Sequence, residues 1–203
     1  MKPHKGFVGV DIDGVMADTF PTFSEFLRET HGICLPAEEV HTHDLSVPLG
    51  VSKAQVEKYL NEFYSTNYFR KIPSREYAFE GLLTLFQRRY DLSIVTSRPS
   101  SLEGETREWV DNHFPPFFWY LDFAKGSFES SSALPTKASI CLERRYGYLI
   151  EDSPENALEV ANSGVMVFLM NHPWNNGTNH AYLDNHPLIK RVKGWREISE
   201  SLK

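Results

Sequence analysis

The 203-residue chain has only two cysteines, no long apolar run and no basic run. Cys34 and Cys141 lack Cys-x-x-Cys or histidine companions, so we expect free thiols rather than a disulfide framework or a zinc site. No stretch approaches the ~18 consecutive apolar residues of a membrane-spanning helix. We therefore expect no membrane span, no signal peptide and a cytoplasmic protein.

The charge balance is mildly acidic, with 27 Asp and Glu against 21 Lys and Arg and a net charge of −6. Because no basic patch is present, a nucleic acid polymer and an anionic membrane surface are not expected partners. Apolar residues make up 41% of the chain, which is enough for the core of one domain, with or without an insertion. The oligomeric state is not readable from composition, and a homodimer stays open.

Two acidic side chains, Asp11 and Asp13, directly follow the apolar run Phe7-Val8-Gly9-Val10. Such a run predicts a buried strand of a parallel sheet, and ligands of open α/β sheets bind where these strands end. Two carboxylates this close raise each other's proton affinity unless a cation joins them, and oxygen ligands suit Mg²⁺. The alternative is structural: the acids cap a helix and Gly14 permits a turn.

Strand and helix patterns alternate through most of the chain, which predicts a doubly wound parallel α/β sheet. We expect this Rossmann-like core to comprise residues 1–16 and 76–203. Residues 17–75 interrupt the alternation with helical patterns and no convincing strand, so we interpret them as a helical cap inserted after the first strand. Further strands are expected at residues 92–95, 117–121, 148–150, 165–169 and 189–192, and helices at 102–113, 137–146, 154–164 and from 195 onward.

Polar groups also follow two later strands. Thr96 and Ser97 end one strand, the pair Glu151-Asp152 ends another, and Lys137 opens the helix between them. Each has an ordinary interpretation when taken alone: the hydroxyls form turns, the lysine is solvated, and the acidic pair starts a helix. Because the carboxyl ends of parallel strands share one edge of the sheet, the whole set indicates one site.

This ordered set resembles the four motifs of the haloacid dehalogenase-like hydrolase superfamily. The resemblance implies a Mg²⁺-dependent phosphotransfer in which Asp11 attacks phosphorus to form an aspartyl-phosphate, while Asp13 protonates the leaving oxygen and then activates water. It also implies metal ligation by Asp11, the backbone carbonyl of Asp13 and Asp152, with Glu151 as a further candidate ligand. Thr96, Ser97 and Lys137 are then the phosphate-binding groups.

Within the superfamily, residues 10–18, the helical insertion and Val95-Thr96-Ser97 are similar to the 5'(3')-deoxyribonucleotidases and their bacterial relatives. This similarity implies a small phosphate ester substrate, in particular a (deoxy)nucleoside monophosphate whose base stacks on cap aromatics. The sequence departs from that family at Glu151, where Asp is usual, and at Arg98-Pro99, where Arg98 could take over a phosphate contact. The candidate stacking residues are Phe20, Phe23, Tyr64, Tyr68 and Phe69, although any of them could simply pack the cap.

Two other functions stay open on the sequence alone. The first is a phosphatase or phosphomutase for a sugar phosphate or another small metabolite, because the catalytic motifs are shared and the cap sets specificity. The second is a catalytically silent module that binds a phosphorylated ligand, although no motif residue is missing.

Two polar segments carry weaker signals. His41-Thr42-His43-Asp44 has ligand-type side chains, but without a further His or Cys at suitable spacing we interpret it as a polar loop and not a zinc site. Asn171-His172-Pro173-Trp174-Asn175 follows a strand at the active edge, and it either shapes substrate entry or forms a plain turn.

Overall fold

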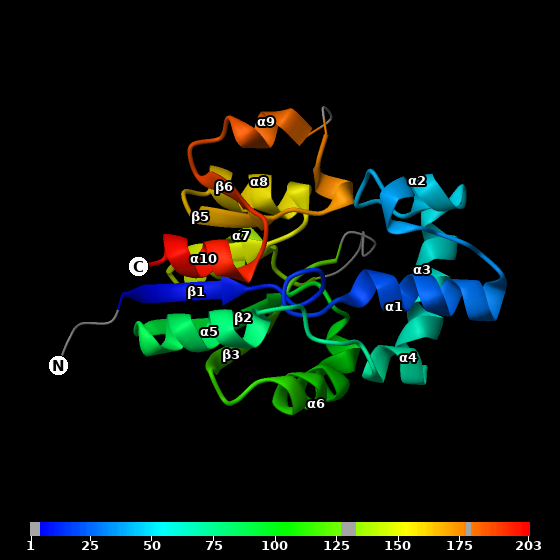
Figure 1. Cartoon of the computed structure of the whole chain (residues 1–203), viewed down its shortest axis with the longest axis horizontal. Coiled ribbons are helices and arrows are strands. Elements are labelled where there is room, and N and C mark those ends of the chain that lie inside the picture. Colours follow the sequence, from blue (N-terminus) through cyan, green and yellow to red (C-terminus); the bar gives the residue numbers. More distant parts are fainter. Residues whose placement is uncertain (1–4, 127–132, 178–179) are drawn as a thin grey trace.

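The computed structural model describes residues 5–126, 133–177 and 180–203. It contains one six-stranded sheet in which every neighbouring pair of strands is parallel, in the order β3-β2-β1-β4-β5-β6. The predicted α/β fold with a parallel, doubly wound sheet is therefore confirmed (Figure 1). The strands are β1 (Gly6–Val10), β2 (Tyr90–Thr96), β3 (Phe118–Phe123), β4 (Tyr146–Glu151), β5 (Met166–Met170) and β6 (Ile189–Val192).

The direction of winding reverses at β1, which pairs with β2 on one side and with β4 on the other. In an open α/β sheet this reversal leaves a crevice beyond the carboxyl ends of the central strands, and ligands bind there. The residues that directly follow β1, β2 and β4 are therefore at the position where a ligand site is expected.

Helices cover both faces of the sheet. Successive strand side chains point to opposite faces, so each face carries apolar side chains that a helix layer buries. Along β4, Ile150 joins the cluster that includes Leu82 and Trp109, whereas Leu149 joins the cluster that includes Ile140 and Val160. The first cluster holds α5 (Ala78–Gln87), α6 (Glu103–His113) and α10 (Trp195–Ser201), and the second holds α7 (Lys137–Glu143), α8 (Pro154–Asn162) and α9 (Ala181–Asp184).

Between β1 and α5 the chain forms only helical elements, which lie together beyond the sheet (Figure 1). We call residues 19–70 the helical segment. The predicted division into a core and a cap at residues 17 and 75 stays a prediction. The elements are α1 (Thr19–Phe26), a π-helix (Leu27–His31), a 3-10 helix (Ala37–Glu39), α2 (Ser46–Leu49), α3 (Lys53–Tyr64) and α4 (Asn67–Arg70).

The loop that follows β1 is fixed by contacts with the last helix of the described chain. The Trp195 indole Nε1 donates a 2.8 Å hydrogen bond to the Val15 carbonyl oxygen. Trp195 packs so closely on α5 that a Cβ atom at Gly81 would lie 2.5 Å from its ring. The contact joins the loop to α10 and α5, so the backbone beside Asp11 and Asp13 is held from two sides.

Both cysteines are free, as predicted; Cys34 is exposed and Cys141 is buried. None of the helices within the described residues has the length and apolar character needed to cross a bilayer.

Candidate active site

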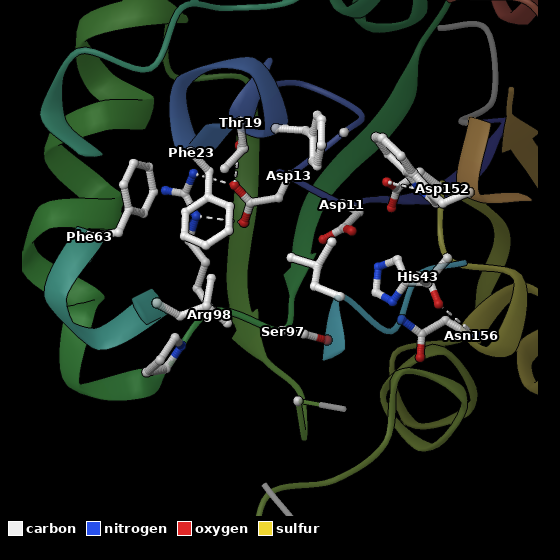
Figure 2. A pocket seen from close by; sticks show the side chains of 18 of the residues that line it. Asp11, Asp13, Thr19, Phe23, His43, Phe63, Ser97, Arg98, Asp152 and Asn156 are labelled. Carbon is white, nitrogen blue, oxygen red and sulfur yellow. Dashed lines mark hydrogen bonds and ion pairs between the residues drawn. The ribbon is translucent and has the colours of Figure 1, made fainter. Parts of the chain in front are cut away.

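One pocket opens at the carboxyl edge of the sheet, between the strand ends and the helical segment (Figure 2). It brings together groups from four separate stretches of the chain, as their positions after β1, β2 and β4 and at the start of α7 predict. Ten of the sequence-predicted residues line it: Asp11, Asp13, Phe20, Phe23, Tyr64, Ser97, Arg98, Lys137, Glu151 and Asp152.

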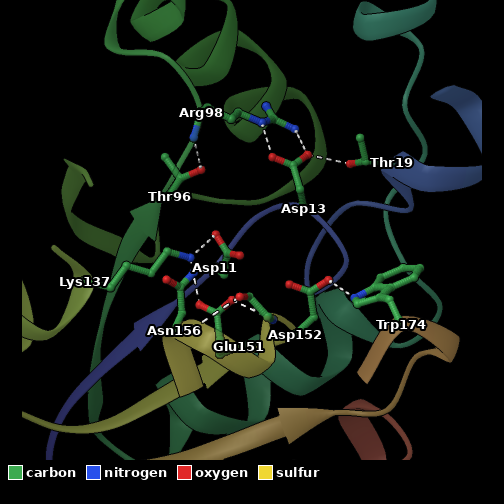
Figure 3. A network of polar contacts seen from close by, with 11 residues as sticks. Asp11, Asp13, Thr19, Thr96, Arg98, Lys137, Glu151, Asp152, Asn156 and Trp174 are labelled. Atoms are coloured by element: carbon green, nitrogen blue, oxygen red, sulfur yellow. Dashed lines mark hydrogen bonds and ion pairs between the residues drawn. The ribbon is translucent and has the colours of Figure 1, made fainter. Parts of the chain in front are cut away.

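Lys137 joins the acidic groups that follow β1 and β4. Its Nζ lies 2.9 Å from Asp11 Oδ1 and 2.7 Å from Glu151 Oε2, and all three side chains are buried (Figure 3). Burial acts against the charge of Lys137, but Asp11 and Glu151 outweigh it and raise the lysine pKa. For Asp11, burial and the charges of Glu151 and Asp13 raise the pKa to about 7 against the opposing effect of Lys137.

Asp152 lies against the backbone of the loop after β1. A Cβ atom at Gly14 would lie 2.1 Å from Asp152 Oδ2, and Gly14 has a φ of +77°. Both the close contact and the backbone angle therefore favour glycine at this position. The Trp174 indole Nε1 donates to the same Asp152 oxygen at 3.1 Å (Figure 3). The Asn175 side-chain amide donates to the Asp152 carbonyl oxygen at 2.7 Å. The segment after β5 therefore positions an active-site carboxylate.

Asp13 points away from the other acids and toward Arg98. The Arg98 Nε and Nη2 donate to the two Asp13 oxygens, each at 2.8 Å, and Thr19 donates a further hydrogen bond (Figure 3). Although burial acts to raise the pKa of Asp13, the Arg98 charge and these hydrogen bonds outweigh it and lower the pKa. The Arg98 guanidinium is itself packed 4.8 Å from the Phe69 ring centroid.

Three sequence-predicted residues do not line the pocket. Thr96 is fully buried and its hydroxyl accepts a 3.2 Å hydrogen bond from the Arg98 backbone amide, so it shapes the turn while Ser97 lines the opening. Tyr68 donates to Glu29 on the exposed side of the helical segment. Phe69 lies beneath Arg98, and thus supports it from outside the opening.

The pocket also contains residues to which sequence reasoning gave no role. His43 comes from the loop before α2, Asn156 from the first turn of α8, and Phe63 from α3 (Figure 2). Trp174 also lines the pocket, and it belongs to the segment for which the sequence allowed either a role in substrate entry or a plain turn. The only prior signal for His43 was its residue type, because its loop has no periodicity.

The acidic cluster fits a divalent cation. Oxygen atoms of Asp11, Glu151 and Asp152 all lie within 4.8 Å of one another, and burial followed by the charges of Glu151 and Asp11 raises the pKa of Asp152 well above its ordinary value. Lys137 and Arg98 balance two of the four carboxylates when Asp13 is counted, which leaves two negative charges uncompensated. An all-oxygen donor set of this charge is suited to a hard cation.

Solved structures with similar folds are haloacid dehalogenase-like hydrolases. One, a hydrolase of that family from Streptococcus pneumoniae, has a TM-score of 0.68 and 16% identity and covers 98% of both chains. A second structure, of a predicted phosphatase from Clostridium acetobutylicum, has a TM-score of 0.70 and 11% identity. The match covers 98% of this chain and 99% of the Clostridium chain. This chain therefore shares the fold of these solved structures.

Sequence comparison narrows this class. The chain belongs to the family described as 5' nucleotidase, deoxy (pyrimidine), cytosolic type C protein, whose model matches residues 5–124. It is also 25% identical, over 190 residues, to a Halalkalibacterium halodurans protein provisionally named as a nucleotidase, with 93% of this chain and 88% of that protein covered. The family predicted from the sequence motifs is therefore confirmed.

Proposed function

We propose that the protein is a Mg²⁺-dependent phosphomonoesterase that acts on deoxynucleoside monophosphates through an aspartyl-phosphate on Asp11. The observation that carries this proposal is the arrangement of two carboxylates of opposite character in one pocket. Asp11 pairs with Lys137 beside the acidic cluster, while Asp13 is held apart by Arg98. Family membership supports the nucleotidase assignment.

Asp11 is the group best suited to attack phosphorus. It is at the end of β1, it lines the pocket, and the Lys137 ammonium 2.9 Å away can also stabilise a phosphoryl oxygen. With its pKa raised to about 7, Asp11 is only partly ionised at neutral pH, and an additional positive charge would favour the carboxylate. A divalent cation in the cluster would supply that charge.

The acidic cluster of Asp11, Glu151 and Asp152 is the proposed Mg²⁺ site, with Asp11 and Asp152 as the direct ligands. Both Glu151 oxygens already accept hydrogen bonds, from Lys137 at 2.7 Å and from the Ser153 amide at 2.9 Å, so we assign Glu151 a positioning role and Asp11 and Asp152 the direct ligation. The bound ion supplies Lewis-acid stabilisation of the phosphoryl oxygens. The residues of this chain do the remaining chemistry.

Asp13 is the general acid and base in this proposal. Its lowered pKa keeps it ionised while it is paired to Arg98, which suits the step in which a carboxylate removes a proton from water. To protonate the leaving oxygen it must first gain a proton, and therefore must loosen its contact with Arg98 when substrate binds. The Arg98 Nη1 is buried and has no acceptor among the described residues.

The apolar wall of the pocket suits a nucleobase. Phe23 and Phe63 lie edge to face with their ring centroids 5.3 Å apart, and Phe20 lies 5.6 Å from Trp174. These rings come from the helical segment and from the segment after β5, so a base and sugar would bind between the two. Flat aromatic surfaces at one end and charged groups at the other match an amphipathic nucleotide.

A phosphate-release panel with Mg²⁺ tests the proposal. We expect turnover of deoxynucleoside 5'- or 3'-monophosphates at kcat/KM values at least tenfold above those for sugar phosphates of equal charge. Hydrolysis of sugar phosphates without deoxynucleotide turnover would contradict the nucleotidase assignment but leave the phosphohydrolase class intact.

A further inference from the structure

His43 is the one histidine of the helical segment that lines the pocket among the described residues. It is half-buried, whereas His41, two residues earlier in the same loop, is exposed. Figure 2 shows the His43 ring directed into the same opening as Asp11 and Asn156, on the side away from the Phe23 and Phe63 rings. The ring thus lies on the side of the pocket that holds Asp11 and Asn156, away from Phe23 and Phe63.

The loop that carries His43 is fixed on both sides. The Thr42 hydroxyl accepts a 3.2 Å hydrogen bond from the Asp44 amide, and Asp44 Oδ1 accepts hydrogen bonds from the Ser46 amide at 3.0 Å and its hydroxyl at 2.6 Å. Lys53 of α3 lies 3.0 Å from Asp44 Oδ2. These contacts hold the backbone at residues 42–46, so the inward direction of the ring is part of the local fold.

No group among the described residues hydrogen-bonds to the His43 ring. A half-buried imidazole that lines a pocket and has no protein partner can donate a hydrogen bond to a ligand. Burial is the largest influence on the His43 pKa and lowers it, with Lys137 acting in the same direction against the charges of Glu155, Glu151 and Asp44. A neutral ring still offers one N–H donor.

The position of His43 distinguishes between two roles for the ring, which are metal ligation and hydrogen bonding to an anionic oxygen. Its nitrogens are not part of the cluster formed by Asp11, Glu151 and Asp152, whose oxygens lie within 4.8 Å of one another, so the geometry does not make it a metal ligand. Ser97, Lys137 and the start of α8, which line the pocket with it, are groups suited to an anionic oxygen.

We propose that His43 donates a hydrogen bond to a phosphoryl oxygen of the bound substrate and so completes the phosphate site that Ser97 and Lys137 provide from the sheet. The contact would connect the helical segment to the core through the ligand. It rests on the phosphohydrolase chemistry proposed above, but it is independent of the identity of the leaving group.

Calorimetric titration of the full, Mg²⁺-loaded chain with inorganic phosphate tests the proposal. We expect His43→Ala and His43→Phe to raise the phosphate Kd about tenfold, the effect of one hydrogen bond to a charged acceptor. Because His43→Phe keeps an aromatic ring at this position, a loss of phosphate affinity in this variant reports the missing donor and not a change in packing. His43→Gln, which retains an N–H donor, should remain within about threefold of the unmodified chain, and the matched control His41→Ala should be unchanged.

Hydrogen exchange gives a second measurement on the same proteins. Phosphate should slow amide exchange over residues 42–46 in the unmodified chain and fail to do so in His43→Phe. Equal phosphate affinity in His43→Phe and the unmodified chain would overturn the proposal, as would a loss in His43→Gln as large as that in His43→Phe. Because inorganic phosphate lacks any leaving group, a failed nucleotidase assignment would leave this result readable.

Discussion

The guanidinium of Arg98 binds the carboxylate of Asp13 through two hydrogen bonds of 2.8 Å, although 85 residues separate them in the chain. The arginine side chain is 1% exposed and is packed on Phe69, 4.8 Å from its ring centroid, and on Trp109, 5.4 Å away. A bidentate pair with a buried arginine fixes both partners in orientation. Arg98 is therefore a positioning residue for the proposed acid and base.

Replacing Arg98 by Met should lower both stability and turnover. Asp13, whose side chain is 36% exposed, would lose its ionic partner, which is expected to cost about 1–2 kcal/mol in the free energy of unfolding at pH 7, measured with urea. The pair lowers the pKa of Asp13 from its ordinary 3.8, so its contribution is present above that pH and is lost as the pH falls through the lower folded-state value. The difference between the two proteins should therefore shrink below about pH 4.

The matched control is Arg107→Met. Arg107 forms an exposed pair with Glu103 on α6 at 2.8 Å, so its loss should change the unfolding free energy by less than about 0.5 kcal/mol. Equal effects of the two substitutions would contradict the positioning role of Arg98.

Replacing Asp11 by Asn should lower kcat for phosphate release by at least about 10³-fold, because an amide is a poor nucleophile. Asp13→Asn should also lower kcat, while Mg²⁺ affinity measured by calorimetry stays within about threefold, since the Asp13 side chain points to Arg98. Asp111→Asn on the exposed side of α6 is the matched control and should leave both quantities unchanged. Full activity in Asp11→Asn would refute the aspartyl-phosphate mechanism.

Mg²⁺ should stabilise the protein more at pH 8 than at pH 6. In the metal-free protein the Asp11 pKa is raised from 3.8 to about 7, so its stabilising contribution is present at low pH and is lost as the pH rises through 7. A cation that binds the ionised cluster reverses this loss, by about 2.7 kcal/mol when free Mg²⁺ is about 100-fold above its Kd.

Thermal unfolding with and without Mg²⁺ measures this effect at each pH. Asp152→Asn should remove most of the shift at pH 8. A shift that is equal at both pH values, or one that persists in Asp152→Asn, would place the metal outside the acidic cluster.

Gly14→Ala should impair Mg²⁺ binding and activity together. The new Cβ would lie 2.1 Å from Asp152 Oδ2, so the carboxylate must move. Gly164→Ala introduces the same kind of backbone strain, with a φ of +97°, but a Cβ there meets no described atom within 4 Å. We expect both variants to lose about 1–3 kcal/mol of stability, and only Gly14→Ala to lose Mg²⁺ affinity in calorimetry.

Most of the sheet was predictable because its central strands are short apolar runs followed by a break, although β6 is Ile-Lys-Arg-Val. The run before Asp11 and the runs 92–95 and 165–169 are buried on both faces, as parallel strands require. The short helices were not predictable: α4 and α9 have four residues each, too few to show a helical period.

The site residues that directly follow a strand were predictable from the sequence. Those whose position depends on tertiary packing were not. Thr96 and Ser97 are adjacent hydroxyls, and only the register of β2 determines that Thr96 turns inward while Ser97 lines the pocket. His43 reaches the opening through the tertiary placement of a loop without local pattern. Asp13 and Arg98 both looked like direct ligands of substrate or metal, and their mutual pairing required the folded geometry.

The hydrogen bond from Trp195 to the Val15 carbonyl also bears on how the protein comes into existence. During synthesis the loop that carries Asp11 and Asp13 leaves the ribosome first, yet its final partner is made 180 residues later. The backbone beside Asp11, the proposed nucleophile, is therefore fully held only after α10 has been translated. Nascent chains stalled before Trp195 should be unable to turn over substrate, however much of the sheet they have already formed.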